Sequence, residues 1–230
     1  VDPTATPTGV QLKPDAANPR YYSDAYTNAD GTTKTNKGNP HGHIIRWNEA
    51  AGDTAALTFE WDVFVLAGDP ALAANAGTVQ TGNINGDTFG SPDGLWFDKQ
   101  GRLWIQTDIS TSALGKGTSA GGYVNMTNNM MLAADTVTGE IKRFLTGPKG
   151  CEVTGVITTP DGKTMFVNIQ HPGEGASDNS NPADALYPNV VSMWPSSQGY
   201  GFQGVAGDDK LRPRSGTVVI TRTDGGVIGA

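Results

Sequence analysis

The sequence of 230 residues contains a single cysteine, Cys151, so the chain cannot form an internal disulfide. A lone cysteine fits a reducing compartment and also a secreted protein without disulfides, so it does not choose between the two. No apolar run approaches the roughly 20 residues that a membrane-spanning helix needs. The sequence therefore excludes a disulfide-stabilised scaffold and predicts no membrane span.

Basic residues are also few, with 16 Lys and Arg against 23 Asp and Glu and a net charge of −7. Domains that bind nucleic acid normally present a basic face, and this sequence has no basic cluster. We therefore expect no nucleic-acid partner. An acidic surface favours solubility and also fits the binding of cations through carboxylates.

Several common catalytic motifs are absent from the sequence, among them HExxH, the phosphate-binding P-loop, GxSxG and paired CxxC. The Ser, His and Cys residues do not suggest a nucleophile with its base. His41 and His43 stand two positions apart, so on a strand both would face the same side and could reach one metal. A histidine-containing strand entrance is the other interpretation, and we favour it.

Turn-forming residues are abundant, since the chain has 31 Gly and 14 Pro, and no sustained amphipathic helix is visible. This composition is typical of an all-β fold with short strands. Residues 1–40 are predicted to be an irregular connecting segment, and one helical turn is expected within 70–76. Hairpins are predicted over 43–68, 94–108, 129–147, 151–170 and 217–230.

Two of these hairpins resemble each other, because the spacing from Gly94 to Gly101 equals that from Gly155 to Gly162. Hairpins with a PDG string alternate with hairpins whose turn reads TGE or is otherwise acidic. Such alternation is typical of four-stranded β-propeller blades, with a β-sandwich as the competing architecture. We predict that residues 41–230 form the C-terminal part of a β-propeller, with two to three blades. The strand-like pattern at the last residues and the first residue, which is not Met, lead us to expect a fragment.

Asp93 raises the question of whether a PDG string is only a turn. Pro-Asp-Gly is a favoured turn sequence, and it fully explains Asp161, which lies between the two strands of its hairpin. Asp93 instead precedes its hairpin, where the inner strand of a blade would begin. In a propeller that end borders the central channel, so Asp93 is a candidate metal ligand.

Other candidates lie near the second PDG hairpin. Glu152 stands three residues before Gly155 and could be a metal ligand or a solvated glutamate at a strand end. Cys151 would be a soft ligand if exposed, but a single cysteine is usually a small buried hydrophobe. His171 and Glu174, in HPGE after an outgoing strand, form either a turn or part of the channel rim.

The chain resembles the C-terminal part of the PhoX-type alkaline phosphatases in strings such as NPHGHIIRWNE, FGSPDGLWFDKQGRLWIQTD, GPKGCEVTGV and TPDGKTMFVNIQHPGE. The resemblance extends over most of residues 19–230. It implies a periplasmic or extracellular phosphomonoesterase with a six-bladed propeller that acts on small phosphomonoesters. It also implies a cluster of Fe³⁺ and Ca²⁺ in the propeller channel.

The resemblance assigns roles to a few residues. Asp93 matches an acidic position of the metal cluster, Glu152 lies in a recurrent family string, and His171 is a candidate substrate contact at the rim. The metal-binding cysteine and the principal catalytic residues of the family precede residue 1, so Cys151 is not that ligand. We therefore expect a chain that lacks the N-terminal half of its own propeller and is inactive alone.

Two alternatives remain open at this point. The string PDG followed by an apolar strand and xLW also resembles the gluconolactonase-like calcium propellers, which open lactones with one divalent metal. A non-catalytic propeller that binds calcium or a partner protein is the other alternative. The strings HGHIIRW and GCEVTGV favour the phosphatase.

Overall fold

A computed structural model describes residues 22–27, 33–71, 82–117, 122–174, 191–196 and 213–229 of the chain. Within these residues the elements are the strands β1 to β12 and one short 3-10 helix, η1, as the all-β prediction requires. The helical turn expected within 70–76 falls largely outside the described residues. No helix in the described part of the chain is long and apolar enough to cross a membrane.

The paired strands are antiparallel, except that β5 pairs with β9 in parallel. The bounds are β1 Tyr22–Thr27, β2 Thr33–Gly38, β3 His43–Glu49, η1 Ala50–Gly52, β4 Phe59–Leu66, β5 Asn85–Gly86, β6 Pro92–Phe97, β7 Leu103–Thr107, β8 Met130–Ala134, β9 Glu140–Thr146, β10 Glu152–Thr158, β11 Thr164–Gln170 and β12 Gly216–Thr221. The sheet orders are β1-β2, β3-β4, β5-β9-β8-β7-β6 and β10-β11-β12. The first four predicted hairpins are therefore confirmed.

Two local predictions were wrong. Residues 1–40 are not irregular throughout, because β1 and β2 pair as an antiparallel hairpin. The fifth hairpin does not form either: β12 pairs with β11, and the described residues after β12 turn instead of forming a strand. The Arg222 guanidinium donates to Asp224 and to the Val227 carbonyl oxygen, and these contacts hold a compact turn.

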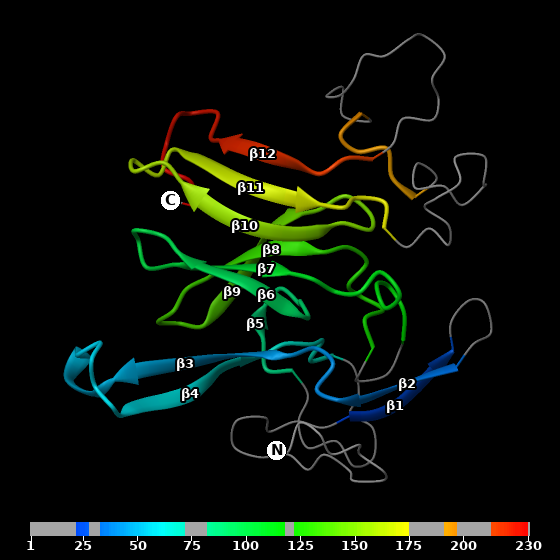
Figure 1. The fold of residues 1–230 in the computed structure, drawn as a ribbon, viewed down its shortest axis with the longest axis horizontal. Coiled ribbons are helices and arrows are strands. Elements are labelled where there is room, and N and C mark those ends of the chain that lie inside the picture. The colour runs from blue at the N-terminus through cyan, green and yellow to red at the C-terminus, as the bar shows by residue number, and fades with distance from the viewer. Residues whose placement is uncertain are drawn as a thin grey trace.

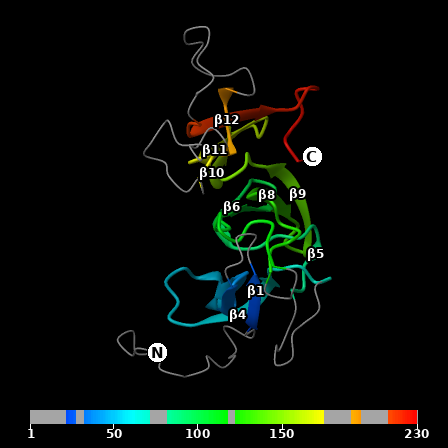
Figure 2. The ribbon, with the colours of Figure 1, turned by 90° about the vertical axis from the view of Figure 1, so that its right-hand side faces the viewer.

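The sheets lie in successive layers, with β10–β12 above β6–β9 and the β3–β4 hairpin below them (Figure 1). The view turned by 90° keeps the same order (Figure 2). Strand β7 is buried on both faces because it lies between two apolar clusters. Ile105 joins the cluster that includes Ile44 of β3, whereas Trp104 joins the cluster with Val153 and Val167 of the upper sheet. Adjacent sheets thus share β7 as their common core strand.

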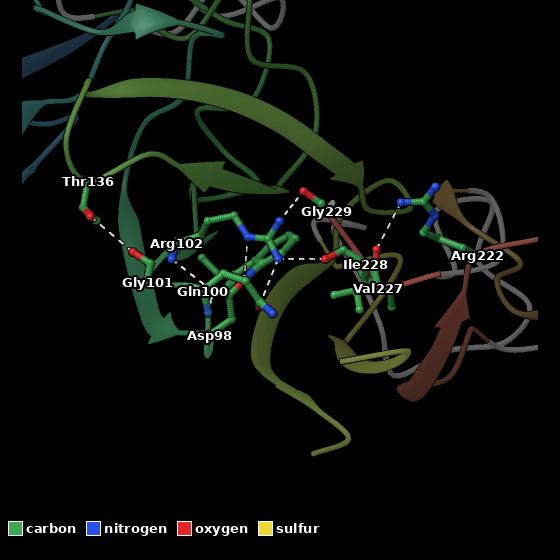
Figure 3. Close-up of polar contacts among 10 residues, drawn as sticks. Asp98, Gln100, Gly101, Arg102, Thr136, Arg222, Val227, Ile228 and Gly229 are labelled. Atoms are coloured by element: carbon green, nitrogen blue, oxygen red, sulfur yellow. Dashed lines mark hydrogen bonds and ion pairs between the residues drawn. The ribbon is translucent and has the colours of Figure 1, made fainter. Parts of the chain in front are cut away.

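A buried polar network fastens the β6–β7 turn to the C-terminal residues (Figure 3). Asp98 accepts hydrogen bonds from Trp104 Nε1 at 2.9 Å and from Arg102 Nε at 2.7 Å. The same guanidinium donates to the carbonyl oxygens of Ile228 and Gly229. Burial acts to raise the pKa of Asp98, but the hydrogen bonds outweigh it and hold the pKa below its usual value. The network therefore ties the two sheets together at one end.

Candidate functional site

Asp93 lies at the irregular start of β6. The pairing of β6 with β7 shifts register between Pro92 and Leu95, which is the sign of a β-bulge. Gly94 lets Gln106 approach this bulge closely, since a Cβ at that position would lie 2.5 Å from the Gln106 side-chain oxygen. Asp93 itself is exposed, and it begins a strand as predicted. Its carboxylate therefore stands at the end of the sheet instead of closing a turn.

The second PDG string behaves differently, as predicted. Asp161 Oδ1 accepts a 2.6 Å bond from the Thr159 hydroxyl and a 3.1 Å bond from the Lys163 backbone N–H. These hydrogen bonds hold the pKa of Asp161 below its usual value. Asp161 is thus a turn residue between β10 and β11, whereas Asp93 lies at the start of strand β6.

Glu152 begins β10, and its side chain is only 12% exposed. Burial raises the pKa of Glu152, and the charges of Asp108 and Asp93 raise it further, against the lowering effect of His171. Both aspartates thus contribute to the raised pKa of Glu152. We call Asp93, Asp108 and Glu152 the acidic rim.

Sequence reasoning missed Asp108, although it ends the string LWIQTD. The Asp108 backbone N–H donates to the Ser91 carbonyl oxygen at 3.1 Å, and Pro92 pairs with Thr107. The outgoing strand β7 therefore ends beside the start of β6, which brings Asp108 to the same end as Asp93. The sequence signal was that Asp93 lies at the start of one strand of the hairpin and Asp108 directly after the other. Antiparallel pairing brings the start of one strand beside the end of the other.

His171 follows β11 and contacts the acidic rim. Its Nε2 lies 3.3 Å from Glu152 Oε2, and its Nδ1 lies 3.6 Å from Glu174 Oε2. The backbone N–H of His171 donates to the Ser215 hydroxyl at 3.0 Å. The residue has a φ of 36°, a conformation that is uncommon for a non-glycine residue. The imidazole is thus held between two glutamates, and the structure brings the predicted Asp93, Glu152 and His171 together at one end.

Cys151 is a core residue. Its side chain is 1% exposed within the cluster shared by β7 and the upper sheet. Burial raises the pKa of its thiol to about 12. A thiol of this kind remains protonated at neutral pH and is a poor metal ligand. Cys151 is therefore a packing residue of the core in this structure.

His41, two residues before β3, and His43, the first residue of β3, have different contacts. His41 is fully buried, its Nε2 lies 2.8 Å from the Gly122 carbonyl oxygen, and its ring packs on Tyr123. His43 Nδ1 instead lies 2.9 Å from the Asn39 side-chain amide. Each histidine is engaged by a different segment, which supports the interpretation as a strand entrance.

The acidic rim has donor atoms of the kind that suits a hard metal ion. Carboxylate oxygens are the hard donors that Ca²⁺ and Fe³⁺ prefer. Burial raises the pKa of Glu152 most, and the charges of Asp108 and Asp93, which a bound cation would neutralise, raise it further. Among the described residues, no group of three or more His, Cys, Asp or Glu is arranged to hold a metal ion. Further ligands would therefore have to come from elsewhere.

Comparison with known proteins gives the class first. Residues 3–173 match the family model described as alkaline phosphatase PhoX. This match covers more than half of the chain, and the chain therefore belongs to the PhoX family of alkaline phosphatases. No curated protein gave a match.

A solved structure agrees with that assignment. The chain is similar to Pseudomonas fluorescens PhoX in complex with vanadate, a transition state analogue, with 43% sequence identity and a TM-score of 0.65. The similarity covers 85% of this chain and 29% of that one. The chain thus spans less than a third of the length of the structure it resembles.

We expect Glu152→Gln to stabilise the metal-free chain near neutral pH. A raised pKa means that the folded state favours the protonated carboxyl, so the stability contributed by this group is lost as pH rises through the folded-state pKa. Glutamine is uncharged at every pH, so it does not place this unfavourable negative charge in the folded state. Thermal unfolding in the presence of EDTA should give a Tm roughly 2–4 °C higher for Glu152→Gln near neutral pH, and no gain near pH 4.

Glu60→Gln is the matched control, since Glu60 is an exposed glutamate on β4. Its Tm should follow that of the unmodified chain at both pH values. A Glu152→Gln chain that is no more stable than the unmodified chain near neutral pH would contradict the electrostatic description of the acidic rim.

Proposed function

We propose that this chain is the C-terminal part of a metal-dependent alkaline phosphatase that hydrolyses small phosphomonoesters. The observation that carries the proposal is the family match over residues 3–173. The solved relative, captured with a transition state analogue, supports the same reaction class. The family match also favours the phosphatase over a lactonase-like or non-catalytic propeller.

The proposed architecture is a six-bladed propeller in the complete protein, of which this chain supplies two to three blades. Strands β6 to β9 would form one four-stranded blade, and β10 to β12 would be three strands of the next. The antiparallel neighbour order and the packing of β10 beside β6 and β7 support this arrangement. The N-terminal half of the propeller would then supply the remaining blades around the apolar core and the remaining ligands of the metal site.

The proposed metals are Ca²⁺ and Fe³⁺, and the acidic rim would supply part of their ligands. Bound cations would supply charge that clamps the phosphoryl oxygens and lowers the pKa of a water nucleophile. Asp93 and Glu152 would bind metal, with Asp108 beside them. His171 would hold the Glu152 carboxylate through its 3.3 Å contact, and it is the proposed substrate contact at the rim. Like the other family members, the protein would work in the periplasm or outside the cell.

The isolated chain should not hydrolyse phosphomonoesters, because no group of three or more possible ligands among the described residues is arranged to hold a metal ion. We expect no turnover of p-nitrophenyl phosphate by the isolated chain with Fe³⁺ and Ca²⁺ added. A full-length protein that carries this chain should hydrolyse the same substrate under the same conditions.

The two proteins test different parts of the proposal. Hydrolysis by the isolated chain would show that the site is complete without further residues. Failure of the metal-loaded full-length protein to hydrolyse p-nitrophenyl phosphate would contradict the phosphatase assignment, and hydrolysis of a lactone instead would favour the alternative enzyme.

A further inference from the structure

Asn129 is a buried polar residue that lies immediately before β8. It is 1% exposed, and its side-chain amide is fully hydrogen-bonded. Its Oδ1 accepts from the Thr107 hydroxyl at 2.9 Å and from the Ile109 N–H at 2.6 Å. Its Nδ2 donates to the carbonyl oxygens of Ile109 at 3.0 Å and Cys151 at 2.9 Å. Two acceptor contacts and two donor contacts use the whole capacity of a primary amide.

These partners are the sequence neighbours of the acidic rim. Thr107 and Ile109 flank Asp108, and Cys151 directly precedes Glu152. A single amide group therefore joins the end of β7 to the start of β10, across the boundary between two sheets. Asp108 and Glu152 therefore each lie next to a backbone group that this amide holds.

The amide is itself held in place from both sides. The Gly147 N–H donates to the backbone carbonyl oxygen of Asn129 at 2.8 Å and so holds the backbone that carries the amide. The Met130 N–H donates to the Thr107 hydroxyl oxygen at 2.9 Å. The backbone of β8 therefore holds the same hydroxyl that donates to the Asn129 side-chain amide. Networks in which every buried group is paired hold one geometry, because any shift leaves a buried donor or acceptor without a partner.

We propose that Asn129 is a positioning residue that sets the separation of Asp108 and Glu152 in the acidic rim. The inference rests on the proposed function, in which these carboxylates contribute to a metal-dependent phosphatase site. Asn129 would act through the backbone on either side of each carboxylate and would touch neither metal nor substrate. An aspartate or an apolar residue of similar size could not replace it, since neither can donate to the carbonyl oxygens of Ile109 and Cys151.

The test uses the full-length protein that carries this chain, with the substitution Asn129→Asp. This change keeps the acceptor oxygen and the side-chain shape but removes both donor contacts. Loss of a residue that orients metal ligands costs about 10–100-fold in metal affinity or activity. We expect a loss of that size in Ca²⁺ affinity, measured by titration of the metal-free protein, with a matching fall in kcat/KM for p-nitrophenyl phosphate. Excess Ca²⁺ should restore part of the activity.

Two further variants separate positioning from a general loss of stability. Thr107→Val removes one donor to Asn129 and leaves the amide in place, so it should weaken Ca²⁺ binding less but in the same direction. If Asn129→Asp does not fold, the Ca²⁺ affinity of Thr107→Val tests the inference by itself. Ile141→Ala, in the buried core of β9 and away from the rim, is the control: it should lower Tm without changing the Ca²⁺ affinity of the folded protein.

The possible failures can be told apart. An Asn129→Asp or Thr107→Val protein that loses Tm but keeps the Ca²⁺ affinity and kcat/KM of the unmodified protein would overturn the inference and leave the proposed function intact. An unmodified protein that neither binds Ca²⁺ nor hydrolyses p-nitrophenyl phosphate would overturn the proposed function, and the inference with it.

Discussion

Replacing Asp93 with asparagine in the full-length protein is expected to lower kcat/KM for p-nitrophenyl phosphate by at least about 100-fold, because a metal site contributes several kcal/mol of transition-state stabilisation. Asp93 is exposed at the bulged start of β6, and its charge acts on Glu152. An asparagine has nearly the same shape but no charge. The bound-metal content of the purified protein should fall together with the activity.

Asp161→Asn is the matched control, since Asp161 occupies the same PDG string. Within the part of the chain that the structure describes, its carboxylate bonds only inside its own turn, to Thr159 and Lys163. An asparagine oxygen can accept the same bonds, so activity and metal content should remain within about twofold of the unmodified protein. Equal losses in the two variants would contradict the distinction between the two PDG strings.

Replacing Trp104 with alanine is expected to lower the free energy of unfolding by about 3–5 kcal/mol, the usual cost of removing a buried tryptophan. Trp104 is 1% exposed on the doubly buried strand β7, and its ring packs edge-on against Phe144 at 5.0 Å. Its indole N–H also bonds Asp98, so truncation leaves a buried carboxylate with one donor fewer. Urea unfolding of the chain, followed by circular dichroism, measures the change.

Trp47→Ala provides the comparison, because Trp47 is also a strand tryptophan but is 59% exposed. It should cost less than about 1 kcal/mol in the isolated chain, since little apolar area is removed from water at that position. If the two tryptophans cost the same, Trp104 would not be the core residue that joins the two sheets.

Local pattern was enough to predict much of the fold. The four main hairpins followed from short apolar runs separated by Gly-containing turns, such as those ending at Gly101 and Gly162. The different positions of Asp93 and Asp161 were also visible from their places relative to those runs. In each case the sequence pattern and the structural feature that it predicts involve residues only a few positions apart in the chain.

Long-range contacts could not be predicted in the same way. Asp108 and Glu152 come together only because β10 packs beside β6 and β7, and nothing in either string indicates that neighbour. Asn129 looks like an ordinary loop residue until Ile109 and Cys151 are seen on either side of it. The pairing of β12 with β11 likewise crosses a long connection, so turn chemistry carries no sign of it.

The most direct test of the acidic rim is the anomalous scattering of metals in crystals of the full-length protein grown with Fe³⁺ and Ca²⁺. We expect a metal peak within about 2.6 Å of a carboxylate oxygen of Asp93 or Glu152, the range of direct oxygen coordination. Metal peaks whose oxygen ligands all come from other residues, with Asp93 and Glu152 out of coordination range, would contradict it.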